Sequence, residues 1–200
     1  MTDAPQLYLM TPAGAQASAL GPLLAEVMDR FPPSCLRIRG GGEEDELGRL
    51  ADLAREIAHA RDVAVVIDDH VKLAQRHGLD GVHLTDGARS VRYARKELGD
   101  DAIVGAFCGN SRHDGMTAAE HGADYVAFGP ASESLLYRGE PAPLELFEWW
   151  SEMIEVPVVA EGSITRDLIG QLSPVADFIA LGPEIWTQDD PLDALVQLWG

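Results

Sequence analysis

The chain alternates short β-branched apolar runs with longer amphipathic stretches from one end to the other, which restricts the fold more than any other feature. The runs with strand character cover residues 7–11, 35–39, 63–67, 81–84, 102–107, 125–128, 156–160 and 178–181. The stretches with helical periodicity cover residues 17–30, 44–60, 70–77, 89–98, 112–121, 143–154, 166–172 and 190–198. This series of eight strand–helix units predicts an α/β fold, a closed (β/α)8 TIM barrel.

Three related phrases recur along the chain and support a repeated unit. They read "HGLDGVHL" at 77–84, "HGADYVAF" at 121–128 and "PVADFIAL" at 174–181, each leaving a helix, passing an aspartate and entering an apolar strand. With 200 residues, 46% of them apolar, the chain is long enough for one sizeable core. We therefore expect a single barrel domain over residues 1–200.

The charge balance excludes several classes of partner. The sequence holds 15 basic and 33 acidic residues, a net charge of −18, which argues against a nucleic-acid or anionic-membrane surface.

No long apolar run or signal peptide is present, so a cytoplasmic protein is expected. Cys35 and Cys108 lie far apart within apolar runs, which predicts buried thiols rather than a disulfide or metal site.

In a barrel of this kind, function concentrates where the strands end, and two glycine turns follow the last two strands. Gly162 and Ser163 follow the seventh strand and Gly182 follows the eighth. Loops at these positions often bind phosphate through backbone N–H groups. The alternative is that the glycines only permit tight turns.

Two arginines in the second strand are candidates for binding a larger anion. Period-two alternation places Arg37 and Arg39 on the same face, and if that face is the interior both guanidiniums point toward the mouth. A pair of guanidiniums suits a pyrophosphate. The alternative is that they pair with nearby acids such as Glu43 and Glu44.

Acidic residues at the ends of the third and fourth strands indicate a magnesium site. Asp68 and Asp69 end the third strand and Asp86 follows the fourth. Mg²⁺ takes one or two carboxylates together with water and phosphate oxygens. Asp69 has an alternative role as the N-cap of the following helix. His83, within the fourth strand, is expected in the core rather than as a catalytic acid.

Two further features bear on the predicted site and the packing around it. The long segment 129–145 after the sixth strand is a candidate cover over the site. Phe147 and Trp150 lie three residues apart on one helical face, which predicts packing onto the barrel rather than base stacking.

The phrases "IDDHVKLAQRHGLDGVHL", "HGADYVAFGP" and "VPVVAEGSIT" resemble the family of thiamine-phosphate synthases and related thiazole tautomerases, and the likeness spans most of the chain. The resemblance implies a (β/α)8 barrel and small phosphorylated partners. Synthases of this family join a thiazole phosphate to an aminopyrimidine pyrophosphate with Mg²⁺, and pyrophosphate leaves in a dissociative, carbocation-like step. The resemblance leaves a homodimer open.

The family motif of the second strand, Gln-x-Arg-x-Lys, falls on Cys35, Arg37 and Arg39, so the resemblance implies that these residues contact substrate and pyrophosphate. The Asn-Asp motif after the third strand falls on Asp68 and Asp69, which makes Asp69 the implied Mg²⁺ ligand. The charges of the motif are kept, whereas the glutamine and the asparagine are replaced.

The remaining family positions are matched less closely. The second metal aspartate falls on Ala88, so Asp86 fills that role only if the loop shifts. The serine after the fifth strand becomes Phe107, and the Thr-x-Thr-Lys of the following loop is absent, with Arg138 the nearest cation. The implied phosphate loops consist of Gly162, Ser163, Leu181 and Gly182.

These departures keep other functions open. The first alternative is a catalytically degenerate paralogue that binds a thiazole or thiamine phosphate, because Phe107 and the missing Thr-x-Thr-Lys remove catalytic groups. The second is another phosphate-binding barrel enzyme. That reading lacks a strand-end lysine for a Schiff base, since Lys72 and Lys96 both lie in predicted helices. Pro130 stands where the tautomerases have a histidine, which argues against that activity.

Overall fold

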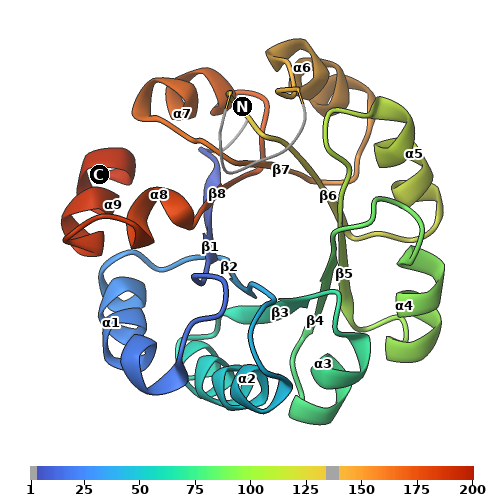
Figure 1. Cartoon of the computed structure of the whole chain (residues 1–200). Coiled ribbons are helices and arrows are strands. Elements are labelled where there is room, and N and C mark those ends of the chain that lie inside the picture. Colours follow the sequence, from blue (N-terminus) through green and yellow to red (C-terminus); the bar gives the residue numbers. More distant parts are fainter. Residues whose placement is uncertain (1–3, 134–139) are drawn as a thin grey trace.

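The computed structural model describes residues 4–133 and 140–200, and these residues form a closed barrel of eight parallel strands in sequential order (Figure 1). The strands are β1 Gln6–Met10, β2 Cys35–Ile38, β3 Ala64–Asp68, β4 Gly81–Leu84, β5 Ile103–Phe107, β6 Tyr125–Phe128, β7 Val158–Glu161 and β8 Phe178–Leu181. The helices are α1 Ala17–Arg30, α2 Glu44–His59, α3 Val71–His77, α4 Val91–Leu98, α5 Arg112–Glu120, α6 Leu144–Met153, α7 Arg166–Leu172, α8 Pro183–Trp186 and α9 Pro191–Trp199. The predicted (β/α)8 barrel is confirmed.

Alternation along the strands separates two layers of buried side chains. A small cluster fills the barrel interior and consists of Tyr8, Met10, Cys35, Val66, Tyr125, Ala127, Val159 and Ala180. A much larger cluster lies between the strands and the helices that surround them in Figure 1. Because side chains point alternately inward and outward, each strand contributes to both layers, and the inward residue at its C-terminal end faces the barrel mouth.

Most predicted element boundaries lie within one residue of the observed ones, and helix α4 begins two residues later than expected. The remaining larger differences concern β7 and the segment that follows β8. The seventh strand was expected over 156–160, but β7 begins at Val158 and includes Glu161, which places this carboxylate at the inner end of the strand. Helix α8 was not predicted at all. A helix of four residues is too short to show a hydrophobic period, so only Pro183 at its first turn could have indicated it.

Packing expectations for the outer layer and the thiols are confirmed. Trp150 and Phe147 are buried, and both rings meet Phe128 edge to face, with centroid distances of 5.1 and 5.8 Å. Cys35 and Cys108 are free and buried. Among residues 4–133 and 140–200, no helix is both long and apolar enough to cross a bilayer.

Candidate functional site

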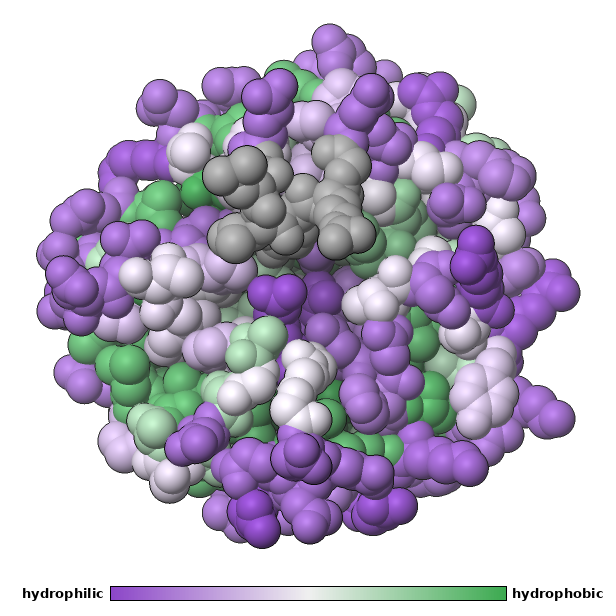
Figure 2. Space-filling view, viewed as in Figure 1, coloured by the Kyte–Doolittle hydropathy of each residue, from purple (hydrophilic) through white to green (hydrophobic). Residues whose placement is uncertain are grey.

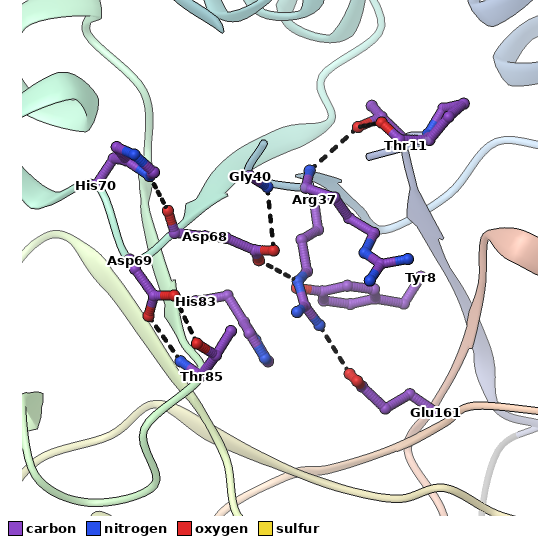
Figure 3. A network of polar contacts seen from close by, with 12 residues as sticks. Tyr8, Thr11, Arg37, Gly40, Asp68, Asp69, His70, His83, Thr85 and Glu161 are labelled. Atoms are coloured by element: carbon purple, nitrogen blue, oxygen red, sulfur yellow. Dashed lines mark hydrogen bonds and ion pairs between the residues drawn. The ribbon is translucent and has the colours of Figure 1, made fainter. Parts of the chain in front are cut away.

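Three charged side chains meet at the barrel mouth, near the C-terminal ends of β2, β3 and β7 (Figure 3). Arg37 lies between Asp68 and Glu161. Its Nε donates to Asp68 Oδ1 at 2.6 Å, and its Nη1 donates to Glu161 Oε2 at 2.8 Å. Arg37, Asp68 and Glu161 are 4%, 8% and 3% exposed. The arginine therefore pairs with acids, as one alternative held, but with Asp68 and Glu161 rather than with Glu43 or Glu44.

Burial and mutual attraction shape the proton affinities of this triad. Burial would lower the pKa of the Arg37 guanidinium, but the attraction of Glu161 and Asp68 outweighs it, so that pKa is raised. Burial raises the pKa of the Glu161 carboxyl, and the charges of Arg37 and Arg39 partly oppose that rise. The two carboxylates already compensate the charge of Arg37, which leaves it poorly suited to act as a free anion ligand.

Beneath the triad, a chain of hydrogen bonds crosses the barrel interior. The hydroxyl groups of Tyr8 and Tyr125 are 2.6 Å apart, and the Tyr125 hydroxyl lies 2.8 Å from His83 Nδ1. Gly105 on β5 makes room for Tyr125, since a Cβ at that position would lie 2.0 Å from the tyrosine ring. His83 is fully buried, as expected of a core histidine.

His83 is also an exception to the usual satisfaction of buried polar groups. Its Nε2 is the only fully buried side-chain polar atom without a hydrogen-bond partner in the part of the chain that the structure describes. Leaving such an atom unpaired costs about 1–3 kcal/mol. Burial, and secondly the positive charge of Arg37, lower the pKa of His83 well below its usual value.

This lowered pKa predicts a loss of stability in acid. In the unfolded chain His83 takes up a proton as the pH falls through about 6.5, whereas in the folded chain it stays neutral. The free energy of unfolding is therefore unaffected by this group above that pH and decreases as the pH falls below it. Below it, one such proton costs about 1.4 kcal/mol per pH unit. Urea unfolding between about pH 7 and about pH 5 should therefore show a steeper loss for the native chain than for His83→Asn. The exposed His113→Asn control should keep the native slope, and equal slopes in all three proteins would contradict the prediction.

Asp69, the first predicted metal ligand, lies directly after the end of β3. Its backbone has a left-handed φ of 54°, and its exposed carboxylate accepts hydrogen bonds from the backbone N–H and hydroxyl of Thr85 at 2.8 and 2.5 Å. The alternative that Asp69 caps the following helix is wrong, because His70 is the N-cap of α3 and no side chain caps that helix. The contact with Thr85 instead fixes the carboxylate between the ends of β3 and β4.

The second predicted metal residue lies in the next loop. Asp86 is exposed and accepts a hydrogen bond from the Ser90 hydroxyl at 2.6 Å. It lines a cleft of about 630 Å³, together with Phe107 at the end of β5. Residues 4–133 and 140–200 contain no cluster of three or more potential metal ligands. Two exposed carboxylates on neighbouring loops nevertheless suit Mg²⁺, which takes most of its ligands from water and phosphate.

The two predicted phosphate loops are joined by a carboxylate that the sequence did not single out. Gly162 and Ser163 have left-handed φ values of 85° and 55° and form the turn after β7. Glu184 of α8 accepts hydrogen bonds from the N–H of Ile164 at 3.3 Å and of Gly182 at 3.0 Å. A negatively charged group of the protein thus engages N–H groups from both loops.

The other residues predicted to contact substrate differ in how deeply they are buried. Cys35 is two residues before Arg37, inside the barrel, and burial raises the pKa of its thiol to about 12. Leu181 packs in the outer layer, so only its backbone remains for a ligand. Arg39 is half-buried, and its N–H donates to the Thr11 hydroxyl at 3.1 Å. Arg138 lies outside the described residues.

Sequence reasoning missed Glu161, Glu184 and Thr11. The signal for Glu161 was present, since an acid at the end of an apolar strand has few partners other than a strand-end cation. Figure 2 shows hydrophilic side chains gathered at the centre of the face that carries the mouth. The polar character of this face agrees with a site for small, charged metabolites.

The family model described as thiamine monophosphate synthase matches residues 7–185. A thiamine-phosphate synthase of Rhodospirillum centenum is 40% identical over 193 residues, covering 93% of this chain and 91% of that protein. One of Erythrobacter litoralis is 43% identical over 154 residues, covering 75% and 72%.

Solved structures agree on the fold. A thiamine phosphate pyrophosphorylase of Pyrococcus furiosus superposes with a TM-score of 0.81 at 22% identity, covering 96% of this chain and 93% of that one. At that identity the structural likeness speaks for the barrel alone, whereas the family model covers residues 7–185, from β1 into α8. By this match the chain belongs to the thiamine monophosphate synthase family.

Proposed function

We propose that the protein is a thiamine-phosphate synthase, which couples an aminopyrimidine pyrophosphate to a thiazole phosphate and releases pyrophosphate. The observation that carries this proposal is the family match over residues 7–185. Apart from Gln6, the first residue of β1, this range contains all eight strands, and it also contains both glycine loops. We propose that the chain works in the cytoplasm as a single-domain barrel.

In this proposal the pyrophosphate binds at the outer part of the mouth. Arg39, which is half-buried directly after β2, is proposed to supply positive charge there. Asp69 and Asp86 would hold Mg²⁺, which supplies positive charge to the departing pyrophosphate when bound. Arg138, in the segment after β6, is proposed as a further cation at the same charge.

The thiazole phosphate is proposed to bind at the turn Gly162–Ser163 and at the backbone of Leu181 and Gly182. Backbone N–H groups at such loops bind phosphate oxygens. Phe107 and Cys35 are proposed to contact the apolar parts of the two substrates. Part of the N–H supply is engaged by Glu184, so a phosphate at both loops has to replace that carboxylate.

Replacing Glu184 with glutamine is therefore expected to tighten the binding of thiazole phosphate. Glu184→Gln keeps the size of the side chain but removes a negative charge that competes with the phosphate, and we expect the Kd to fall by about tenfold. Isothermal titration with thiazole phosphate measures the change. Glu145→Gln, an exposed acid in the first turn of α6, is the matched control. An unchanged or higher Kd in Glu184→Gln alone would show that the phosphate binds elsewhere.

A second candidate function is a non-catalytic protein that binds a thiazole or thiamine phosphate. The charge compensation of Arg37 by Asp68 and Glu161 favours it, because it removes a cation from the proposed stabilisation of the leaving group.

A synthase assay tests the two candidates directly. Purified protein is mixed with both substrates and Mg²⁺, and thiamine phosphate is detected after oxidation to its fluorescent product. Turnover that requires Mg²⁺ supports the synthase. Absence of turnover, together with thermal stabilisation by thiazole phosphate, supports the binding protein.

A further inference from the structure

The floor of the barrel mouth, formed by Arg37, Asp68 and Glu161, has a net charge that does not suit an anionic ligand. One guanidinium and two carboxylates leave the triad Arg37, Asp68 and Glu161 with a net charge of −1. The side chains of Arg37 and Glu161 are 5% and 4% exposed and that of Asp68 is 12% exposed, so salt and water screen their interactions only weakly. A pyrophosphate placed against this floor would meet two carboxylates for each cation.

The floor nevertheless offers hydrogen bonds of both kinds. Within the described residues, neither Nη2 of Arg37 nor Oε1 of Glu161 makes a hydrogen bond. Neither is among the fully buried atoms that lack a partner in the described part of the chain. Because the Arg37–Glu161 ion pair holds the two groups together, a donor and an acceptor lie side by side at the bottom of the mouth (Figure 3).

His83 is an independent sign that this floor is incomplete. It is the register partner of Asp68 in the β3–β4 pair, so the two side chains lie side by side on the inner face of the barrel. Figure 3 shows its ring directed toward the barrel axis, on the side of Arg37 and Glu161. Its Nε2, fully buried, has no partner among the described residues. An unpaired polar atom beside the triad indicates a region built to be completed by a further polar molecule, water or ligand.

We propose that the pair Arg37–Glu161 binds the uncharged aminopyrimidine ring, with Arg37 donating to a ring nitrogen and Glu161 accepting from the adjacent amino group. This assignment rests on the proposed function, and it makes Glu161 a specificity-determining residue that selects a cyclic amidine edge. It also separates the two arginines of β2. Arg37 recognises the ring, and Arg39 serves the pyrophosphate.

A charge-conserving double variant separates ring binding from anion binding. Arg37→Met combined with Glu161→Met removes one positive and one negative charge, so the net charge of the floor stays the same while both hydrogen-bonding groups are lost. The matched control is Asp29→Met with Arg61→Met, an ion pair with an N–O distance of 2.8 Å outside the mouth. Isothermal titration uses three probes: the aminopyrimidine alcohol without phosphates, its analogue with a carbonyl in place of the amino group, and inorganic pyrophosphate with Mg²⁺.

The double variant is expected to weaken binding of the aminopyrimidine alcohol by at least about tenfold, while the Kd for pyrophosphate changes by less than about threefold. The native chain and the control should bind the amino compound more tightly than the carbonyl analogue. Loss of pyrophosphate binding in the double variant, or equal affinity of the native chain for both ring probes, would overturn the assignment. A native chain that binds neither ring probe would overturn it as well.

Turnover of the native protein tests the proposed function separately. Turnover with loss of pyrophosphate binding in the double variant removes this inference and leaves the synthase. Ring selectivity that depends on Arg37 and Glu161, without turnover, supports the inference and removes the synthase. Thermal unfolding of each variant confirms that the barrel is intact before binding is compared.

Discussion

Arg37→Met is expected to lower the free energy of unfolding by about 3–5 kcal/mol, the largest stability change predicted for this chain. The substitution leaves the carboxylates of Asp68 and Glu161 buried without the guanidinium that compensates them. Asp68 keeps one hydrogen bond, from the Gly40 N–H at 3.2 Å, whereas Glu161 keeps none to the described residues. Urea denaturation at about pH 7, where both carboxyls ionise in the unfolded chain, measures the effect.

A double-mutant cycle identifies the cause of this loss. Adding Glu161→Met to Arg37→Met removes one of the two uncompensated charges, so the double variant should be more stable than Arg37→Met alone. The cycle should give a coupling free energy of about 1–3 kcal/mol. If the two substitutions simply add, the side chains contribute through packing and not through their charges.

Asp69→Asn is expected to reduce kcat/KM by about 10²–10³-fold while leaving the fold intact. Asparagine tolerates the left-handed φ of 54° and can still accept from Thr85, so the substitution mainly removes the negative charge proposed to hold Mg²⁺. Turnover measured across a range of Mg²⁺ concentrations should show a higher metal requirement as well as a lower maximum.

The chain provides a closely matched control for this substitution. Asp62 also has a left-handed backbone, with φ 56°, and lies between α2 and β3 at the opposite end of the barrel. Asp62→Asn makes the same chemical change in the same backbone conformation, and we expect turnover to stay within about twofold of the native chain. Native turnover in Asp69→Asn would exclude this carboxylate as a metal ligand.

The sequence alone was enough to predict the barrel and to indicate that the candidate site lies at the C-terminal ends of its strands. Periodicity is a local property, so a strand such as Tyr125–Phe128 and a helix such as Ala17–Arg30 could be located to the residue. The same alternation placed Arg37 and Arg39 on one face of the second strand but did not decide whether that face is the interior. Position after a strand indicated Asp69 and Gly162 as candidate residues of the mouth. The apolar neighbours of His83 were enough to predict a buried histidine.

Partner choice was decided only by the tertiary structure. Arg37 and Glu161 are separated by 124 residues, and no local pattern connects them. They meet because closure of the barrel brings the C-terminal ends of β2 and β7 to the same mouth. Burial then leaves each charged side chain with few other partners. Glu184 likewise joins two loops because a four-residue helix, invisible to periodicity, directs its carboxylate between them. Sequence period determines which face a side chain occupies, whereas strand register and barrel closure determine what it meets there.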